Sequence, residues 1–200
     1  MKVKGDLMDN ELKIKDFLKN NYNYISTADF LKLNISKPLI KKYIDNGLIR
    51  KVSHGLYIEC GNIEDDLYIL QKRYPNIIYS YNTALYLLNL LYKESDKINI
   101  TVNSKKRVIG DYDIHYVSDK YYDIGIVEIT NMMNNPIKIY NAERCICDML
   151  KNNDFDLNLQ NEVLDNYFKS KDKDINRLLE YSKIFNIYDK VNTLVEYAIR

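Results

Sequence analysis

The fold of the N-terminal region follows from one stretch of sequence, SKPLIKKYIDNGLIRKVSHGLYI, at residues 36–58. Its first half predicts a helix that Ser36 caps and that Asn46-Gly47 ends, because glycine tolerates the left-handed conformation found after many helices. The apolar stripe of this helix is formed by Leu39, Ile40, Tyr43 and Ile44. Residues 48–58 then predict two short strands around a turn at Ser53-His54-Gly55.

The residues before this stretch predict two further helices. Apolar side chains recur at helical spacing from Leu12 to Leu18, after a cap at Asp9 or Asn10 and before a break at Asn20-Asn21. Ser26 or Thr27 caps a short second helix that carries Ala28, Phe30 and Leu31. Three short helices followed by a basic hairpin are typical of a winged helix-turn-helix, which we assign to residues 1–60.

Residues 61–200 alternate between helical and extended patterns. Helices are expected at 62–73 and 82–91, and from Ala142 to the C-terminus. The expected strands are residues 76–80, 97–102, 113–117, 124–130 and 137–140. The predicted fold class is therefore α/β (α+β), with a winged helix-turn-helix followed by a mixed α/β domain that ends in a helical tail.

The distribution of charge separates these two regions. Residues 1–60 contain 11 Lys or Arg and 7 Asp or Glu, whereas the remainder contains 18 and 21. A basic segment in a near-neutral chain is the pattern of a DNA-reading module on a body that does not bind DNA. The 3 cysteines follow no disulfide spacing, no apolar leader is visible and residues 74–92 are too polar to span a bilayer, so a cytoplasmic protein without membrane contact is expected.

The third helix and the hairpin contain the candidate binding residues. When the apolar stripe faces inward, the polar side chains of the helix face outward, where lysines reach phosphates or guanine acceptors and the first turn suits a phosphate. The candidate DNA-binding residues are Ser36, Lys37, Lys41, Lys42, Arg50, Lys51 and His54. The expected partner is double-stranded operator DNA with inverted repeats; a solvated helix and an ordinary hairpin are the alternative interpretation.

These residues also resemble a known family. The segments ISTAD (25–29), NIS (34–36) and NGLIRKVSHGLY (46–57) resemble the winged helix of AbiEi-type antitoxins, the transcriptional regulators of type IV abortive-infection toxin–antitoxin systems in phage defence. Lys51 intervenes between Arg50 and Val52, and His54 stands where the family often has a second arginine. The segments SYNTAL (80–85) and YNAERCICDML (140–150) resemble two motifs of the family's second domain, with Cys145 in place of a threonine.

The resemblance implies an antitoxin that represses its own operon through upstream DNA repeats. It further implies that residues 61–200 counteract a partner toxin of nucleotidyltransferase fold. A stand-alone winged-helix regulator with a partner-sensing domain is the first alternative. Contacts to a partner are expected on the C-terminal helices, at Asp172, Asp174, Glu180 and Tyr181.

A metal-dependent nucleotidyltransferase is the second alternative. Asp111 and Asp113 would share one strand face, as a two-metal site requires, and Glu128 would supply a third acid. No Gly-Ser pair precedes them to hold a triphosphate, so a polar turn explains these acids better. We therefore expect no catalytic residue, metal or cofactor.

Three further sequence features lie within residues 61–200. Arg144 and Asp148 lie four residues apart, the spacing of an ion pair on one helix face beside Glu143. Cys145 and Cys147 have neither zinc nor redox spacing and are expected in the core. Lys105-Lys106-Arg107 is expected to form a solvated turn, with a second phosphate-contacting patch as the alternative.

Overall fold

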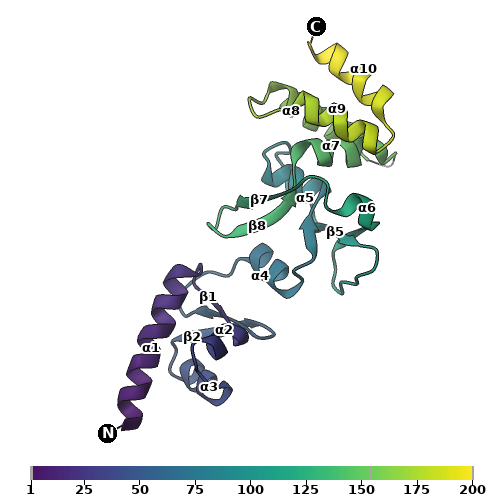
Figure 1. The fold of residues 1–200 in the computed structure, drawn as a ribbon. Coiled ribbons are helices and arrows are strands. Elements are labelled where there is room, and N and C mark those ends of the chain that lie inside the picture. The colour runs from purple at the N-terminus through teal and green to yellow at the C-terminus, as the bar shows by residue number, and fades with distance from the viewer. Residues whose placement is uncertain (1, 154, 200) are drawn as a thin grey trace. The chain divides into compact units, whose positions relative to one another are not determined.

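The protein has a mixed α/β fold, shown in Figure 1 by a computed structural model that describes residues 2–153 and 155–199. The chain divides into two compact units. Unit 1 contains residues 1–73 and 132–135, and unit 2, which we call the body, contains residues 74–131 and 136–200. Unit 1 therefore extends past residue 60, the boundary expected from the sequence, to residue 73.

Unit 1 combines helices with a small antiparallel sheet. Its helices are α1 (Lys2–Asn20), α2 (Thr27–Lys32), α3 (Lys37–Asp45) and α4 (Asp66–Arg73). Its strands are β1 (Tyr24–Ser26), β2 (Ile49–Ser53) and β3 (Leu56–Glu59), in the order β1-β3-β2. The β2–β3 hairpin is as predicted. Strand β1 is not, since three residues are too few to show an alternating pattern.

The core of unit 1 is formed by the apolar faces of its helices and sheet. Its buried members are Ile14, Leu18, Ile25, Phe30, Ile35, Ile40, Tyr43 and Ile49. Leu39 and Ile44 only border this core, so the buried stripe of α3 is narrower than expected. Leu12 and Leu31 lie outside it, with 62% and 52% of their surfaces exposed, because neither falls on the inner face of its helix.

The end of α3 fixes the start of the hairpin. Gly47 has a φ of +70°, and its N–H donates to the carbonyl of Ile44 (2.9 Å) while the N–H of Leu48 donates to that of Tyr43 (3.0 Å). This pair of bonds is the Schellman motif, so the predicted role of Gly47 is confirmed. At the other end of the hairpin, the N–H of Thr27 donates to the carbonyl of Gly55 (2.8 Å), which attaches the turn to α2.

A capping box begins α2. The N–H of Asp29 donates to Ser26 Oγ (3.2 Å), and the N–H of Ser26 donates to Asp29 Oδ2 (3.1 Å). Burial acts to raise the pKa of Asp29, but hydrogen bonds from Ser26 and Lys32 outweigh it and lower the pKa below 3.8. Of the two predicted caps, Ser26 is therefore the one used.

Replacing Ser26 with alanine is expected to lower the stability of unit 1 by about 1 kcal/mol, because one first-turn N–H loses its acceptor. Since the folded-state pKa of Asp29 is depressed, the contribution of its bonds is complete above pH 3.8 and is lost as the pH falls through the folded-state pKa. Urea unfolding of both proteins at neutral and acidic pH should show a stability difference that shrinks in acid. A difference that is constant with pH would contradict this account.

One carboxylate holds α4 and residues 132–135 within unit 1. Asp65 Oδ1 accepts from the N–H of Tyr68 (3.0 Å), and Asp65 Oδ2 accepts from Asn135 Nδ2 (2.6 Å). The N–H of Asp65 donates to the hydroxyl of Tyr24 (2.9 Å), whose ring lies 4.8 Å from that of Tyr68. These contacts explain why unit 1 continues to residue 73.

The body contains a five-stranded mixed sheet. Its strands are β4 (Ile77–Tyr79), β5 (Asn99–Asn103), β6 (Asp113–Val117), β7 (Ile126–Thr130) and β8 (Pro136–Tyr140). The spatial order is β6-β5-β4-β8-β7. The pairs β4–β8 and β5–β6 are parallel, and β4–β5 and β7–β8 are antiparallel. All five strands lie where the sequence predicts them, within a few residues.

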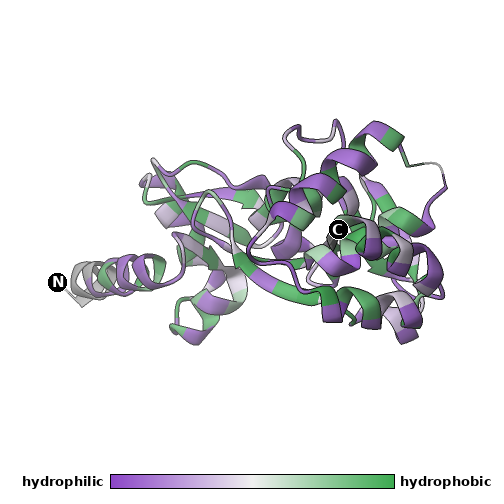
Figure 2. Ribbon diagram, turned by 90° about the horizontal axis from the view of Figure 1, so that it is seen from above, coloured by the Kyte–Doolittle hydropathy of each residue, from purple (hydrophilic) through white to green (hydrophobic). Residues whose placement is uncertain are grey.

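Helices pack beside this sheet and continue to the C-terminus. They are α5 (Tyr81–Leu87), α6 (Asp119–Tyr122), α7 (Ala142–Lys151), α8 (Leu157–Lys169), α9 (Ile175–Ile184) and α10 (Tyr188–Ile199). Helix α7 packs against α5, α8 and α9, and α10 packs against α9. Most helices carry both hydrophobic and hydrophilic residues (Figure 2), as helices with one buried face must. Within residues 2–153 and 155–199, no helix is long and apolar enough to cross a membrane.

Candidate nucleic-acid interface

A groove of about 420 Å³ runs between α3 and the β2–β3 hairpin of unit 1. We call it the lysine groove. Its lining residues are Thr27, Lys37, Ile40, Lys41, Ile44, Lys51, His54, Gly55 and Tyr57. Four of the seven predicted DNA-binding residues therefore border one concave surface.

The periodicity of α3 explains which of its lysines line the groove. Residues three and four apart share a helix face, so Lys37 and Lys41 lie on the side of α3 that also carries Ile40 and Ile44. Lys42 is one residue further on, about 100° around the helix axis, and it is exposed outside the groove. The three lysines predicted together thus separate into a groove pair and a single outlying side chain.

The alternation of side chains along β2 separates its two basic residues, so that Lys51 lines the groove and Arg50 does not. Lys51 lies opposite Tyr57 in the β2–β3 register, and both line the groove. Successive side chains of a strand point to opposite faces, so Arg50 points away from it. The Arg50 guanidinium forms an ion pair with Glu64 and donates to the carbonyl of Asn62 (2.9 Å). Arg50 thereby holds the segment that follows the hairpin.

Ser36 occupies the N-cap position of α3 and is exposed. Its backbone has the extended conformation of a cap, but its hydroxyl accepts no hydrogen bond from the first turn. Pro38 has no N–H and the N–H of Leu39 donates to the carbonyl of Ser36 (3.0 Å), so the Ser36 hydroxyl and the N–H of Lys37 are the first-turn donors left for an acceptor such as a phosphate. Ser36 directly precedes Lys37, which lines the groove.

Thr27 and Tyr57 line the groove but were not predicted. Thr27 Oγ1 lies 3.4 Å from the carbonyl oxygen of Gly55, in addition to the backbone bond between these residues. The ring of Tyr57 packs edge-on against Phe30 at 5.8 Å. Tyr57 could have been found from strand alternation, since it pairs with Lys51. The position of Thr27 depends on the tertiary contact between α2 and the turn.

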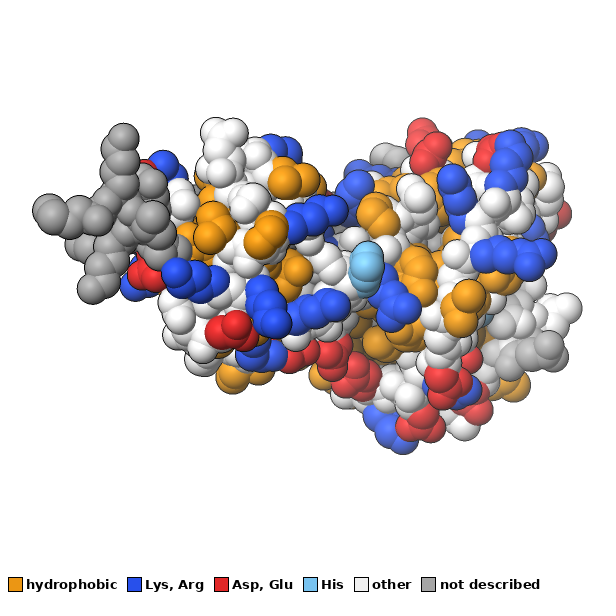
Figure 3. Space-filling model, turned by 90° about the horizontal axis from the view of Figure 1, so that it is seen from below, with side chains coloured by type: hydrophobic (Ala, Val, Ile, Leu, Met, Phe, Trp, Pro, Cys, Tyr) orange, Lys and Arg blue, Asp and Glu red, His pale blue; other side chains and the backbone are white. Residues whose placement is uncertain are grey.

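The groove has the chemistry of a polyanion site. Its lining contains three lysines and, among the described residues, no Asp or Glu. Ile40, Ile44 and Tyr57 form an apolar floor between the lysines. On the face drawn in Figure 3, Lys and Arg side chains gather with apolar side chains between them.

Comparison with known proteins adds nothing to this geometry. No family model and no curated protein matches the chain.

The acids of the nucleotidyltransferase alternative do not come together. Asp111 lies before β6 and forms an ion pair with Lys97 (2.5 Å), while Asp113 is the first residue of β6. Glu128 lies on β7, and β6 and β7 are the opposite edges of the five-stranded sheet. With strands about 4.8 Å apart, Glu128 is too far from Asp113 to share a metal ion. Within the described ranges, no three His, Cys, Asp or Glu side chains are grouped as metal ligands would be.

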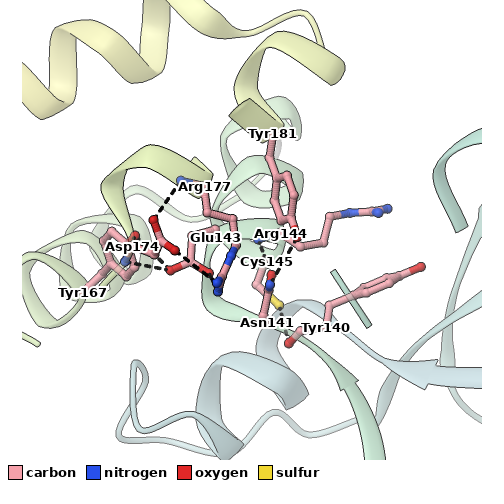
Figure 4. A network of polar contacts seen from close by, with 9 residues as sticks. All are labelled: Tyr140, Asn141, Glu143, Arg144, Cys145, Tyr167, Asp174, Arg177 and Tyr181. Carbon is pink, nitrogen blue, oxygen red and sulfur yellow. Dashed lines mark hydrogen bonds and ion pairs between the residues drawn. The ribbon is translucent and has the colours of Figure 1, made fainter. Parts of the chain in front are cut away.

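In the body, polar contacts join the start of α7 to residues of α8 and α9 (Figure 4). Glu143 is only 2% exposed, and its Oε1 accepts from the Tyr167 hydroxyl (3.0 Å) and from the N–H of Asp174 (3.2 Å). Arg177 lies 3.6 Å from Glu143 Oε2 and 3.1 Å from Asp174. Glu143 therefore joins α7 to α8 and to the start of α9, which is an architectural role.

Arg144 is fully buried beside this network. Its Nε donates to Asp148 (2.9 Å), as the spacing predicted, and its Nη1 donates to the carbonyls of Tyr121 (2.6 Å) and Ile124 (2.9 Å). Its guanidinium carbon lies over the ring of Tyr140, 4.3 Å from the ring centroid, and over that of Phe185, 4.5 Å from the centroid. Burial raises the pKa of Asp148 although Arg144 opposes that shift.

The cysteines of α7 are core residues, as predicted. Cys145 and Cys147 are completely buried, and burial raises the pKa of the Cys147 thiol to about 12. A thiol with that pKa supplies almost no thiolate near neutral pH. Both cysteine side chains therefore contribute to the packing of the core.

Residues from two further groups of predicted contact residues have structural partners. Asp174 caps α9 by accepting from the N–H of Arg177 (2.9 Å), and the Tyr181 hydroxyl accepts from Asn141 Nδ2 (3.4 Å). In the loop after β5, Lys105 forms an ion pair with Asp119, whereas Lys106 and Arg107 are exposed. Lys105 thus stabilises a turn, in line with the preferred interpretation of that run.

Proposed function

We propose that the protein is an autoregulating transcriptional repressor of the antitoxin type, in which unit 1 is a winged helix-turn-helix that binds operator DNA. The observation that carries this proposal is the lysine groove, where Lys37, Lys41 and Lys51 border a concave surface without acids. Helices α2 and α3 supply the helix-turn-helix pair, α3 is the recognition helix, and the β2–β3 hairpin is the wing.

The lysine groove is suited to the sugar-phosphate backbone that separates the major and minor grooves of DNA. With α3 in the major groove, the first turn, with Ser36 and Lys37, reads bases or phosphates, and Lys41 and Lys51 flank the intervening backbone. His54 at the turn reaches toward the minor groove. The apolar floor of Ile40, Ile44 and Tyr57 suits the sugar carbons between the phosphates. On the opposite face of β2, the ion pair of Arg50 with Glu64 stabilises the hairpin that carries this surface.

We further propose that the body counteracts a partner toxin of nucleotidyltransferase fold, in the cytoplasm where operator DNA is found. The similarity of residues 80–85 and 140–150 to the second domain of AbiEi-type antitoxins supports this part. Co-expression with the product of the neighbouring gene tests it. Restored growth indicates an antitoxin, and a neighbouring product without toxicity indicates a stand-alone regulator.

The first experiment is a titration of the full chain against its own upstream DNA and a scrambled duplex, at low and physiological salt. We expect preference for the upstream duplex to persist at physiological salt, since base contacts add to the salt-sensitive phosphate term. Equal binding to both duplexes that disappears with salt would contradict sequence-specific regulation.

The separation of Lys41 from Lys42 gives a matched pair of variants. Lys41→Ala should weaken binding to all duplexes alike and reduce the slope of log K against log salt by about 1, because one phosphate contact is lost. Lys42→Ala removes the same charge from the same helix outside the groove and should change the slope much less. Equal slopes for both variants would place the DNA elsewhere on α3.

A further inference from the structure

Two motifs of the body that lie sixty residues apart in sequence meet at one cavity. Tyr81, from the segment SYNTAL, and Arg144 and Asp148, from α7, line a cavity of about 280 Å³. We call it the motif cleft. Its full lining is Tyr81, Val117, Tyr121, Arg144, Asp148, Lys151, Asn152 and Phe185.

Tyr81 holds an unusual backbone conformation at this cavity. Its φ is +45°, a left-handed value that is rare for a bulky side chain and persists only where the surroundings impose it. Its ring stacks on that of His115, with centroids 3.8 Å apart and planes inclined by 24°. Tyr81 also lines an adjoining cavity of about 410 Å³, which includes His115 and Asn99. Tyr81 thus borders both cavities, with one face of its ring covered by His115.

Asp148 supplies a hydrogen-bond acceptor inside the motif cleft. Its side chain is 11% exposed, and one carboxylate oxygen accepts from Arg144. The other oxygen has no hydrogen-bond donor among the described residues, although Asp148 borders the cavity. A carboxylate oxygen at a mostly buried position favours a ligand that brings an N–H group.

The rim of the motif cleft is positively charged. Lys151, at the end of α7, is exposed, and its ammonium lies 5.8 Å from the centroid of the Tyr121 ring. The ammonium of Lys120 lies 5.0 Å from the same centroid. Among the described residues, neither Lys151 nor Lys120 forms an ion pair, so this side of the motif cleft attracts an anionic group.

We propose that the motif cleft binds a nucleotide, with an N–H group of the base on Asp148, the ring against the aromatic walls and the phosphate at Lys151. A nucleotide combines a flat ring, N–H donors and a negative charge in one small molecule, and the cleft complements all three. The motif cleft, at about 280 Å³, lies just below the size range of small-molecule sites, and the second cavity that Tyr81 lines, at about 410 Å³, lies within its lower part. This inference concerns the body alone and does not rest on DNA binding by unit 1.

Calorimetric titration of the full chain with 5′-mononucleotides, the corresponding nucleosides and inorganic phosphate tests the proposal. We expect at least one nucleotide to bind more tightly than its nucleoside, and phosphate alone to bind far more weakly than either. Repeating the titration with the Lys41→Ala/Lys51→Ala variant should leave nucleotide affinity unchanged, which separates the motif cleft from the lysine groove. Lost affinity in that variant, or equal binding of phosphate and nucleotide, would overturn the proposal.

Single variants then test which residue contacts the phosphate and which contacts the base. Lys151→Gln should weaken nucleotide binding about tenfold and leave nucleoside binding unchanged, because only the phosphate contact is lost. Lys169→Gln removes an exposed charge outside the cleft and should have no effect. Asp148→Asn should weaken nucleotide and nucleoside equally. If that variant fails to fold, the Lys151 comparison still decides, and a Lys151→Gln protein that keeps its preference for nucleotides would refute the assignment.

Discussion

Replacing Arg144 with methionine is expected to destabilise the body by about 3–5 kcal/mol, the range found when one partner of a buried ion pair is removed. Methionine preserves much of the side-chain volume but leaves the carboxylate of Asp148 without its ion-pair partner. It also removes the donor to the carbonyls of Tyr121 and Ile124. Thermal unfolding followed by circular dichroism measures the loss.

Two comparisons make this prediction specific. Lys169→Met breaks an ion pair whose side chains are both 76% exposed, and it should change stability by less than about 0.5 kcal/mol. The double variant Arg144→Met/Asp148→Leu removes both charges and should recover part of the loss. A single variant as stable as the wild type would mean that the buried pair contributes little.

The effect of Arg144→Met should also depend on pH. Burial already raises the folded-state pKa of Asp148 above 3.8, and loss of the guanidinium raises it further. A group with a raised folded-state pKa binds its proton more readily when folded, so stability falls as the pH rises from 3.8 through that pKa. The destabilisation should therefore be largest at neutral pH and shrink toward pH 3.8.

Gly125→Ala is expected to destabilise the body by about 2–4 kcal/mol. Gly125 has a φ of +84°, and an added Cβ would lie 2.7 Å from Arg144 Cβ and 3.0 Å from Asn141 Oδ1. Alanine is therefore strained at this backbone conformation, and its methyl group also clashes with the residues at the start of α7. Hydrogen exchange of the amides of α7 measures the loss in the unit where it occurs.

Gly61→Ala is the matched control for this substitution. Gly61 also has a positive φ, +92°, but an added Cβ would meet nothing within 4 Å. Its cost, read from the amides of unit 1, should be the backbone strain alone, about 1–2 kcal/mol. Equal losses at the two glycines would show that the contact with Arg144 adds nothing.

The sequence predicts most elements of this fold because their signals are local. Gly47 marks the end of α3, the turn at His54-Gly55 marks the hairpin, and the strands of the body show apolar runs of the expected length. Strand β1 and helix α6 are too short to carry a period. The extension of unit 1 to Arg73 and residues 132–135 depends on the tertiary contacts of Asp65, which leave no pattern in the sequence.

The candidate site is predicted less completely, because a surface depends on which face a side chain occupies. Helical spacing distinguishes Lys41 from Lys42, and strand alternation distinguishes Lys51 from Arg50, but only when the register is known. The convergence of Tyr81 with Asp148 required the packing of α5 against α7. Neither motif alone indicates a cavity.

The bond between Asn135 and Asp65 makes unit 1 discontinuous along the gene. A recombination event near codon 73 would transfer the helices and hairpin of unit 1 but leave behind the codons for residues 132–135. The acquired module would then lack one of its own segments, and the recipient would keep a hairpin tip with no matching carboxylate. Shuffling of unit 1 between relatives is therefore expected to require compensating changes at Asp65 or Asn135, so the residues at these two positions should change together.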